Sequence, residues 1–261
     1  MNHIRHPAVA GLFYSDDRTQ LQQDVDGFLS AARPAGEPPK ALIAPHAGYI
    51  YSGPIAASAY INLMPVHATI KKVVLLGPSH RVAFNGLAAP TSNKFITPLG
   101  SVSIDQSSLK KISGLPQVKL MDEAHAQEHS LEVHLPFLQT VLDDFQLIPL
   151  VVGDASAEDV AEVLEQIWGG PETLIVISSD LSHYHSYTTA HKLDQQTSHA
   201  IENLQPEKIQ YEMACGRNPV NGFLKLAKQK GLHGKTLDLR NSGDTAGTKD
   251  RVVGYGAYVF N

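Results

Sequence analysis

The segment that most constrains the fold of this chain is the run of residues 173–185, TLIVISSDLSHYH. Its apolar part, Leu174 to Ile177, is short and largely β-branched, as is typical of a strand buried on both faces. Polar residues follow at once, beginning with Ser178 and Asp180. Open α/β sheets bind ligands outside the carboxyl ends of their strands. We therefore expect a functional site where this strand ends.

Two other segments repeat this design. Residues 41–44 are apolar and lead into His46, and residues 73–76 are apolar and lead into His80. If these strands and the strand before His183 are parallel, the three imidazoles lie on one rim of the sheet. Any one of them could be an ordinary loop histidine, but three in corresponding places favour a shared site. Neutral imidazole is a common ligand of Fe, Zn and Cu, and two imidazoles with one anionic ligand form a site with open positions.

Strand and helix patterns alternate along the rest of the chain. The expected strands are residues 41–44, 72–77, 87–89, 102–104, 146–152, 174–177, 236–240 and 252–260. The first helix is expected to begin after Asp17 and to run to about Leu29. Further helices are expected over residues 54–64, 127–143, 156–168, 187–203 and 219–230. This alternation predicts an α/β fold with a mainly parallel central sheet and helices on both faces, in three layers. Without a repeat or an interior linker, we expect a single domain over residues 1–261.

Composition excludes several classes of function. The formal net charge of -5 argues against nucleic-acid binding by phosphate neutralisation, so we expect no nucleic-acid partner. No apolar run approaches the length of a membrane span, and we expect no membrane association. The N-terminus has charges and a proline where a signal peptide is apolar, which predicts a cytoplasmic protein. The 13 histidines make metal chemistry worth testing.

A second group of polar residues lies in the segment HAQEHSLEVH, residues 125–134. If this segment is helical, His125, His129 and Glu132 share one face and could bind a metal. The segment lacks the His-Glu-x-x-His order of zinc proteases. The alternatives are a polar helix face that touches the site without coordinating anything, and a role for His129 in contacting substrate.

The single cysteine, Cys215, is the third candidate. One cysteine excludes an internal disulfide, and a lone cysteine is most often a small buried hydrophobe. However, Gly216 and Pro219 indicate a turn just before a helix. A thiol near a helix N-terminus has its thiolate favoured, so it can act as a metal ligand or a nucleophile.

Several segments together carry a resemblance to a known family. They are VAGLFY at 9–14, APHAGYIYSG at 44–53, LLGPSH at 75–80, EHSLEVHLPFL at 128–138, SSDLSHY at 178–184, CGRNP at 215–219, NSGD at 241–244 and VVGYGAY at 252–258. In these segments the chain resembles the Memo family, whose bacterial and archaeal members are often described as AmmeMemoRadiSam system protein B. The segments follow the order of the family and span nearly the whole chain.

The resemblance implies a fold like that of the catalytic subunit of class III extradiol dioxygenases, which are non-haem iron enzymes that cleave catechol rings. It places the metal ligands of the family on His46, His80 and Cys215, so that His183 is no longer a third ligand. The extradiol enzymes use a carboxylate where this chain has a thiol. Iron, as Fe(II), is the metal that the resemblance implies, and the softer thiolate leaves Cu or Zn open.

The resemblance further implies an acid/base pair formed by Asp180 and His183. We expect a metal-dependent oxidoreductase in which His183, oriented by Asp180, moves a proton on a small phenolic or enediol substrate. His129 is expected to be a second polar contact. The alternatives are a non-catalytic protein that uses the inherited pocket to bind a metal or a peptide, and a zinc hydrolase. The family's name suggests a radical-SAM protein and an AMMECR1-like protein as functional partners.

Overall fold

The structure is a computed structural model that describes residues 3–261. Its central feature is a sheet of 12 strands. The strands along its main path lie in the order β1-β5-β6-β8-β3-β9-β2-β12-β10, while β11 pairs with β12, β4 with β8, and β7 with β4. Their bounds are β1 Ile4–Arg5, β2 Ala41–Ala44, β3 Lys72–Pro78, β4 Leu87–Ala89, β5 Lys94–Thr97, β6 Gly100–Ile104, β7 Val118–Leu120, β8 Gln146–Val152, β9 Thr173–Ser178, β10 His183–His185, β11 Gly234–Asn241 and β12 Val252–Phe260.

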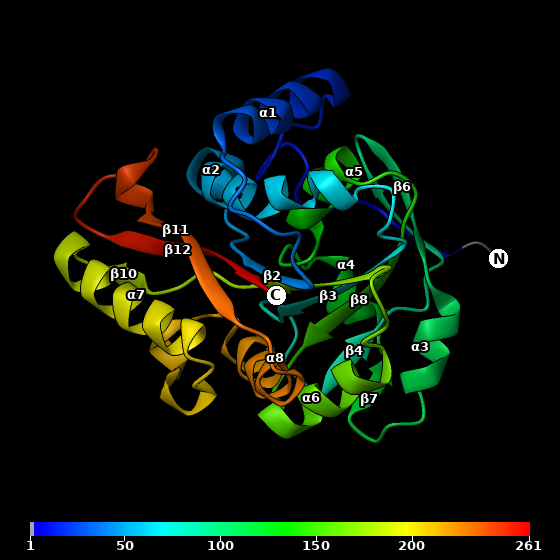
Figure 1. Cartoon of the computed structure of the whole chain (residues 1–261). Helices are drawn as coiled ribbons and strands as arrows, with labels where there is room; N and C mark the ends of the chain where they lie inside the picture. Colours follow the sequence, from blue (N-terminus) through cyan, green and yellow to red (C-terminus); the bar gives the residue numbers. More distant parts are fainter. Residues whose placement is uncertain (1–2) are drawn as a thin grey trace.

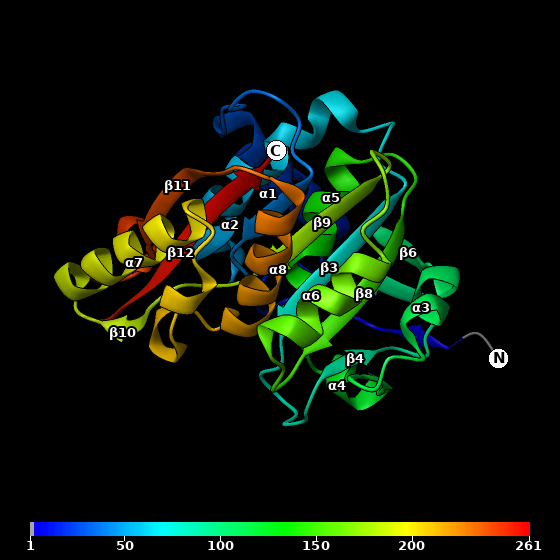
Figure 2. The same cartoon turned by 60° about the horizontal axis from the view of Figure 1, so that its bottom comes forward.

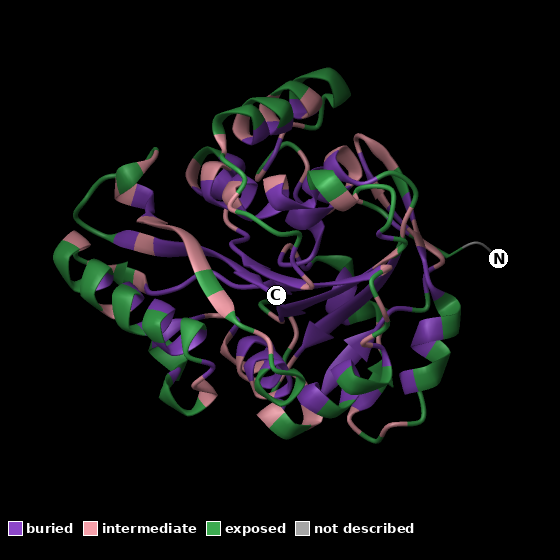
Figure 3. Cartoon of the chain, viewed as in Figure 1, coloured by how far each residue is buried: buried purple, intermediate pink, exposed green. Residues whose placement is uncertain are grey.

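The centre of the sheet is parallel. The five neighbouring strands β6, β8, β3, β9 and β2 all run in one direction, whereas β12 is antiparallel to β2 and β11 is antiparallel to β12. Every residue of β2 and β9 is buried, which explains why these strands are apolar without alternation (Figure 3). The prediction of a mainly parallel central sheet is confirmed, and antiparallel strands extend it.

Helices cover both faces of this sheet. In Figure 1, α1 (Arg18–Ala31), α2 (Tyr49–Tyr60) and α5 (Leu135–Val141) lie above the sheet, and α6 (Ala157–Gln166), α7 (Tyr187–Glu202) and α8 (Arg217–Lys230) lie below it. Figure 2 shows α6 and α8 in front of β3, β8 and β9. The three predicted layers are therefore confirmed. Within residues 3–261, no helix is long and apolar enough to cross a membrane.

The remaining helical segments are short. They are α3 (Gln106–Ile112), α4 (Asp122–Ala126) and the 3-10 turns η1 (Ile61–Val66), η2 (Glu132–His134), η3 (Pro206–Lys208), η4 (Tyr211–Met213) and η5 (Ser242–Asp244). Two of these, η2 and η4, lie on the segments that lead into α5 and α8.

The sheet brings distant polar segments to one edge. β9 lies between β2 and β3, parallel to both, and Ala44 is in register with Ser178 while Leu76 is in register with Ile177. The segments that follow β2, β3 and β9 therefore leave the sheet at the same edge. This confirms the prediction that the segments after these strands, which carry the three rim histidines, converge.

The predicted helix over residues 127–143 is wrong in its first half. Only Leu135–Val141 forms an α-helix, preceded by the 3-10 turn Glu132–His134. Upstream of the turn, the Glu128 carboxylate accepts the backbone N–H groups of His129 and Ser130, which competes with helical hydrogen bonding. The proline near the start of α5 suits a first helical turn, where a missing N–H costs nothing.

The helix predicted to start at Pro54 starts earlier, at Tyr49. Gly48 is its N-cap, and Pro54 lies inside the helix, where its ring removes one backbone hydrogen bond. The expected starting role of Pro54 is therefore wrong. The helix also ends earlier than predicted and continues as the 3-10 turn η1.

Close packing of α8 on α6 provides a test of the lower layer. A Cβ at Gly222 would lie 2.3 Å from Cβ of Val160, so Gly222→Ala should destabilise the protein by about 1–3 kcal/mol through overpacking. The measurement is the urea midpoint of unfolding. Val160→Ala in the same chain should restore part of the loss, because it removes Cγ1 of Val160, which would lie 2.4 Å from the added Cβ, although Cβ of residue 160 stays.

Gly27→Ala is the matched control, since Gly27 is an exposed helical glycine of α1 with no atom within 4 Å of its added Cβ. That change should stabilise by about 0.5–1 kcal/mol. Equal effects of the two substitutions would contradict the packing of α8 on α6.

Candidate metal centre

His46 is held in one tautomer by a chain of hydrogen bonds. Its Nδ1 lies 2.6 Å from Oγ of Ser178, and that hydroxyl donates its proton to the carbonyl of Ser130 at 2.6 Å. Because the Ser178 proton is used, Nδ1 of His46 must donate, which leaves Nε2 without a proton. Burial, and then the neighbouring imidazoles His80 and His129, hold the pKa of His46 well below its ordinary value. The ring is therefore neutral and presents a lone pair.

His80 is oriented by a carboxylate. Glu128 Oε1 lies 2.9 Å from Nδ1 of His80, and Glu128 Oε2 accepts the His80 backbone N–H at 2.5 Å. Burial alone would raise the pKa of Glu128, but the hydrogen bonds from His80 and Ser130 lower it to about 2. An ionised carboxylate only accepts, so Nδ1 of His80 donates, which leaves Nε2 as the nitrogen through which the ring can bind a metal. A carboxylate behind a histidine is a common arrangement at metal sites.

Cys215 approaches these rings from the other side of the rim. It precedes the N-cap of α8, Gly216, whose Cβ, if present, would lie 2.5 Å from the carbonyl oxygen of Ser178. Only glycine permits so close an approach to β9. Sγ lies 3.3 Å from Nε2 of His46 and accepts the Asp180 N–H at 3.3 Å. Burial, and then the charge of Asp180, raise the pKa of the thiol.

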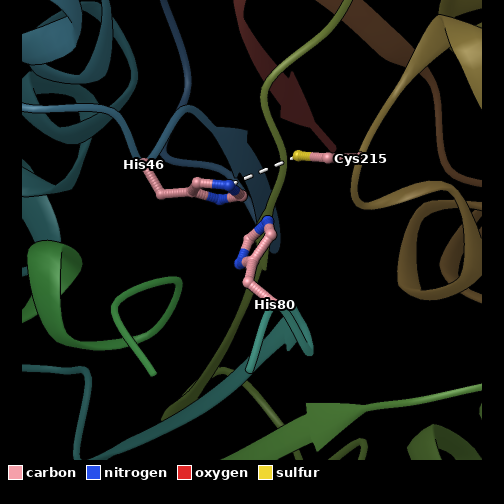
Figure 4. Close-up of side chains that lie close together, drawn as sticks. All are labelled: His46, His80 and Cys215. Atoms are coloured by element: carbon pink, nitrogen blue, oxygen red, sulfur yellow. Dashed lines mark hydrogen bonds between the residues drawn. The ribbon is translucent and has the colours of Figure 1, made fainter. Parts of the chain in front are cut away.

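These three residues fit a metal ion. Their candidate ligand atoms all lie within 4.8 Å of one another, close to twice a metal–ligand bond of about 2.0–2.3 Å. Figure 4 shows His46, His80 and Cys215 converging from three separate segments. Both imidazoles have Nδ1 engaged as a donor, so each would bind a metal through Nε2, and a cation would favour the thiolate that burial disfavours. The donor set of two imidazoles and a thiol suits Fe, Cu or Zn.

The segment that carries His129 does not form the helical face considered above. His129 stacks on His80, with ring centroids 4.6 Å apart, and its ring also lies 5.4 Å from that of His46. The other two members point elsewhere: His125 Nε2 contacts the Ala88 carbonyl at 2.9 Å, and Glu132 pairs with Arg5. A metal site made of His125, His129 and Glu132 is therefore wrong, because the segment is not one helix.

His129 itself belongs to the rim. Its Nδ1 is buried without a hydrogen-bond partner and lies 3.2 Å from Glu128 Oε1. Burial is the main cause that lowers the pKa of His129 to about 4, so the ring is neutral. With His80 and Glu128, it forms a second group whose candidate ligand atoms lie within 4.8 Å of one another.

Asp180 lies on the loop that follows β9 and His183 begins β10, but no hydrogen bond joins their side chains. Oδ1 of Asp180 accepts the His46 backbone N–H at 2.8 Å, and burial raises the pKa of Asp180 to about 7. Nδ1 of His183 donates to the Leu181 carbonyl at 2.8 Å, so its Nε2 has no proton. Burial lowers the pKa of His183. The expected orientation of His183 by Asp180 is replaced by one through Leu181.

An irregularity in β10 lets all three of its residues line one cavity. The register of β10 shifts between His183 and His185, and Tyr184 has a left-handed φ of 60°. A regular strand points successive side chains to opposite faces, whereas here all three residues line one cavity of about 800 Å³. His80 and Cys215 line the same cavity. Two of the three candidate metal ligands are therefore accessible from a space that could hold a small molecule, while His46 is buried behind them.

The fold and these side chains define an α/β protein with a candidate His/His/Cys metal centre at the carboxyl edge of its sheet. The sequence matches the family model described as Memo-like protein over residues 5–259, and the chain belongs to the Memo family. It is similar to proteins named MEMO1 family protein from Aquifex aeolicus (37% identical), Metallosphaera sedula (34%) and Nitrosopumilus maritimus (32%). Each comparison covers 98% of this chain and 99% of the relative. The resemblance drawn from the sequence is thus confirmed.

Two residues of the site escaped sequence reasoning. The sequence predicts Ser178 at the end of its strand, but no pattern in the sequence predicts its hydrogen bond with His46. The sequence places Glu128 in the expected helix over residues 127–143, whereas in the structure it orients His80 from 48 residues away. An acidic residue beside a histidine was the only local signal for it.

The segment carrying Glu128 and His129 depends on a buried ion pair. Arg5 pairs with Glu132, and its guanidinium also donates to the carbonyls of His125 and Glu128. Arg5→Met should destabilise the protein by about 3–5 kcal/mol, because Glu132 is left buried without its cation. The measurement is the free energy of unfolding in urea.

The control is Lys225→Met, which breaks the partly exposed pair of Lys225 with Glu158 on the lower helices. It should cost about 1 kcal/mol or less. If Arg5→Met were no more costly than this control, the anchoring of the segment by Arg5 would be refuted.

Proposed function

We propose that this protein is a metal-dependent oxidoreductase of the non-haem iron type that acts on a small phenolic or related substrate. The observation that carries the proposal is the cluster of two imidazoles, each oriented through its Nδ1, beside the Cys215 thiol, with His80 and Cys215 in the wall of an open cavity. His46, His80 and Cys215 would hold the metal. Fe(II) is our first choice, and Cu or Zn are the alternatives because thiolate is a soft ligand.

When bound, the metal would supply a Lewis acid and a redox centre for oxygen chemistry. The protein would supply proton transfer. His183 is the base, since its Nδ1–H is fixed on Leu181 and its Nε2 can take the proton of a substrate hydroxyl in the cavity. A neutral imidazole of lowered pKa is in the correct form for this step at pH 7.

Two further groups complete the proposed site. Asp180 is the second proton carrier of the rim, because its buried carboxyl has a pKa raised to about 7 and lies beside the Cys215 loop. His129 contributes an unpartnered, neutral Nδ1 between His80 and the N-terminal segment, where Phe13 packs on its ring. We assign it a polar contact to substrate or to a ligand of the metal.

Oxygen uptake with a panel of catechols tests this proposal. His183→Ala should retain the metal content of the wild type and lose turnover by about 100-fold or more, because it removes the base but no ligand. The control is His67→Ala, which changes an exposed histidine that is paired with Asp143 outside the cavity. This variant should keep both the metal content and the turnover of the wild type. Full turnover in His183→Ala would remove His183 from the mechanism. Oxygen-independent hydrolysis by a zinc form would favour the hydrolase alternative.

Glu128→Gln tests the orientation of His80. The amide can accept from Nδ1 of His80 but carries no charge, so we expect the affinity for Fe(II) to fall by about 10–100-fold. The measurement is an anaerobic Fe(II) titration. Glu165→Gln, at an exposed pair with Lys230, is the matched control and should leave the affinity unchanged. An unchanged affinity in Glu128→Gln would separate the carboxylate from the metal site.

If wild type consumes no oxygen with any catechol, the alternative of a non-catalytic metal- or peptide-binding protein takes the lead, and if it also binds no metal only peptide binding is left of that alternative. Functional partnership with a radical-SAM protein and an AMMECR1-like protein, and a cytoplasmic location, stay predictions from the sequence and its family resemblance. Co-purification of the three proteins from a host that encodes them tests the partnership.

A further inference from the structure

The cavity beside the candidate metal centre contains one arginine whose charge has no acidic partner. Arg217 lies two residues after Cys215, in the first turn of α8. It lines the same cavity as His80, His183 and Cys215. Its side chain is half-buried, so its charge is only partly screened by solvent.

Neutral groups hold this guanidinium in place. Nε and Nη2 of Arg217 lie 3.3 and 3.1 Å from Oδ1 of Asn218. The Asn218 amide donates to the Gly153 carbonyl at 2.9 Å, which fixes its oxygen toward the arginine. On another side, the guanidinium carbon lies 5.7 Å from the centre of the Tyr211 ring. The guanidinium is therefore oriented without being neutralised.

The other partly or fully buried arginines with strong contacts are paired with acids. Arg5 pairs with Glu132 and Arg240 with Asp238, whereas Arg217 forms no salt bridge within residues 3–261. Two carboxylates, Asp154 and Glu212, also line the cavity. Both are exposed to solvent and neither is an ion-pair partner of Arg217. The positive charge thus remains available to a molecule in the cavity.

We propose that the cavity binds an acidic substrate whose carboxylate pairs with Arg217. The planar guanidinium matches a carboxylate in two parallel hydrogen bonds, and its unused N–H groups are free to donate. The inference rests on the proposed function and deepens it: the phenolic substrate carries a carboxylate, with its hydroxyl at the end of the cavity formed by His183 and Cys215. A cavity of about 800 Å³ is large enough for such a molecule.

The test compares two probes of nearly the same shape, the anionic 4-hydroxybenzoate and the neutral 4-hydroxybenzamide, by calorimetric titration of the full chain with and without Fe(II). The acid should bind wild type about tenfold or more tightly than the amide, as expected for a charge-assisted contact. Arg217→Gln should abolish this preference while leaving the affinity for the amide unchanged. Retained amide binding also reports that the variant is folded.

Two more variants sharpen the result. Arg217→Lys keeps the charge but not the planar fork, so it should retain only part of the preference. Arg33→Gln makes the same change of charge at a residue outside this cavity and should retain all of it. The proposal is overturned if wild type binds acid and amide equally, if Arg217→Gln keeps the preference, or if neither probe binds at about 10 mM.

The metal-free titration separates this inference from the proposed function. An Arg217-dependent preference for the acid in the metal-free protein supports the carboxylate site even if no metal binds. Conversely, an Fe(II)-loaded protein without the preference overturns the carboxylate site and leaves the proposed metal centre intact.

Discussion

The carboxylate of Glu128 is the constraint on which the rest of the site depends. One oxygen receives the His80 backbone N–H, and the other lies against the His80 ring and the N–H groups of His129 and Ser130. These contacts join the end of β3 to the segment before α5 and decide which nitrogen of His80 can face a metal. Arg5 adds to this by binding the Glu128 carbonyl. The N-terminal segment, the sheet edge and the candidate ligand are thus fixed together.

His46 is oriented in a similar way, but by the hydroxyl of Ser178, the last residue of β9, instead of by a carboxylate. Ser178 donates a hydrogen bond to the Ser130 carbonyl and accepts one from Nδ1 of His46. Because Ser130 also contacts Glu128, both imidazoles are oriented by one short segment. The protein thereby orients Nε2 of both imidazoles before any metal binds. The thiol of Cys215 differs, since burial keeps it protonated until a cation offsets that cost.

Much of this could be predicted from the sequence. The strands β2, β3 and β9 are apolar on both faces, and their shared direction placed His46, His80 and His183 on one rim. The segment before α5 could not be predicted, because side-chain hydrogen bonds to Glu128 override the helical pattern there. Nor could the orientation of His183, since a backbone carbonyl, that of Leu181, is its partner. Such contacts leave no residue pattern in a single sequence.

The central claim is that His46, His80 and Cys215 form one metal site. The most direct test is the metal content of protein purified without oxygen, for wild type beside His46→Ala, His80→Ala and Cys215→Ala. Our account predicts near-stoichiometric iron in wild type and its loss in each variant, all of which should remain folded. A wild type that is empty and takes up no added iron, copper or zinc would contradict it, as would a variant that keeps its metal.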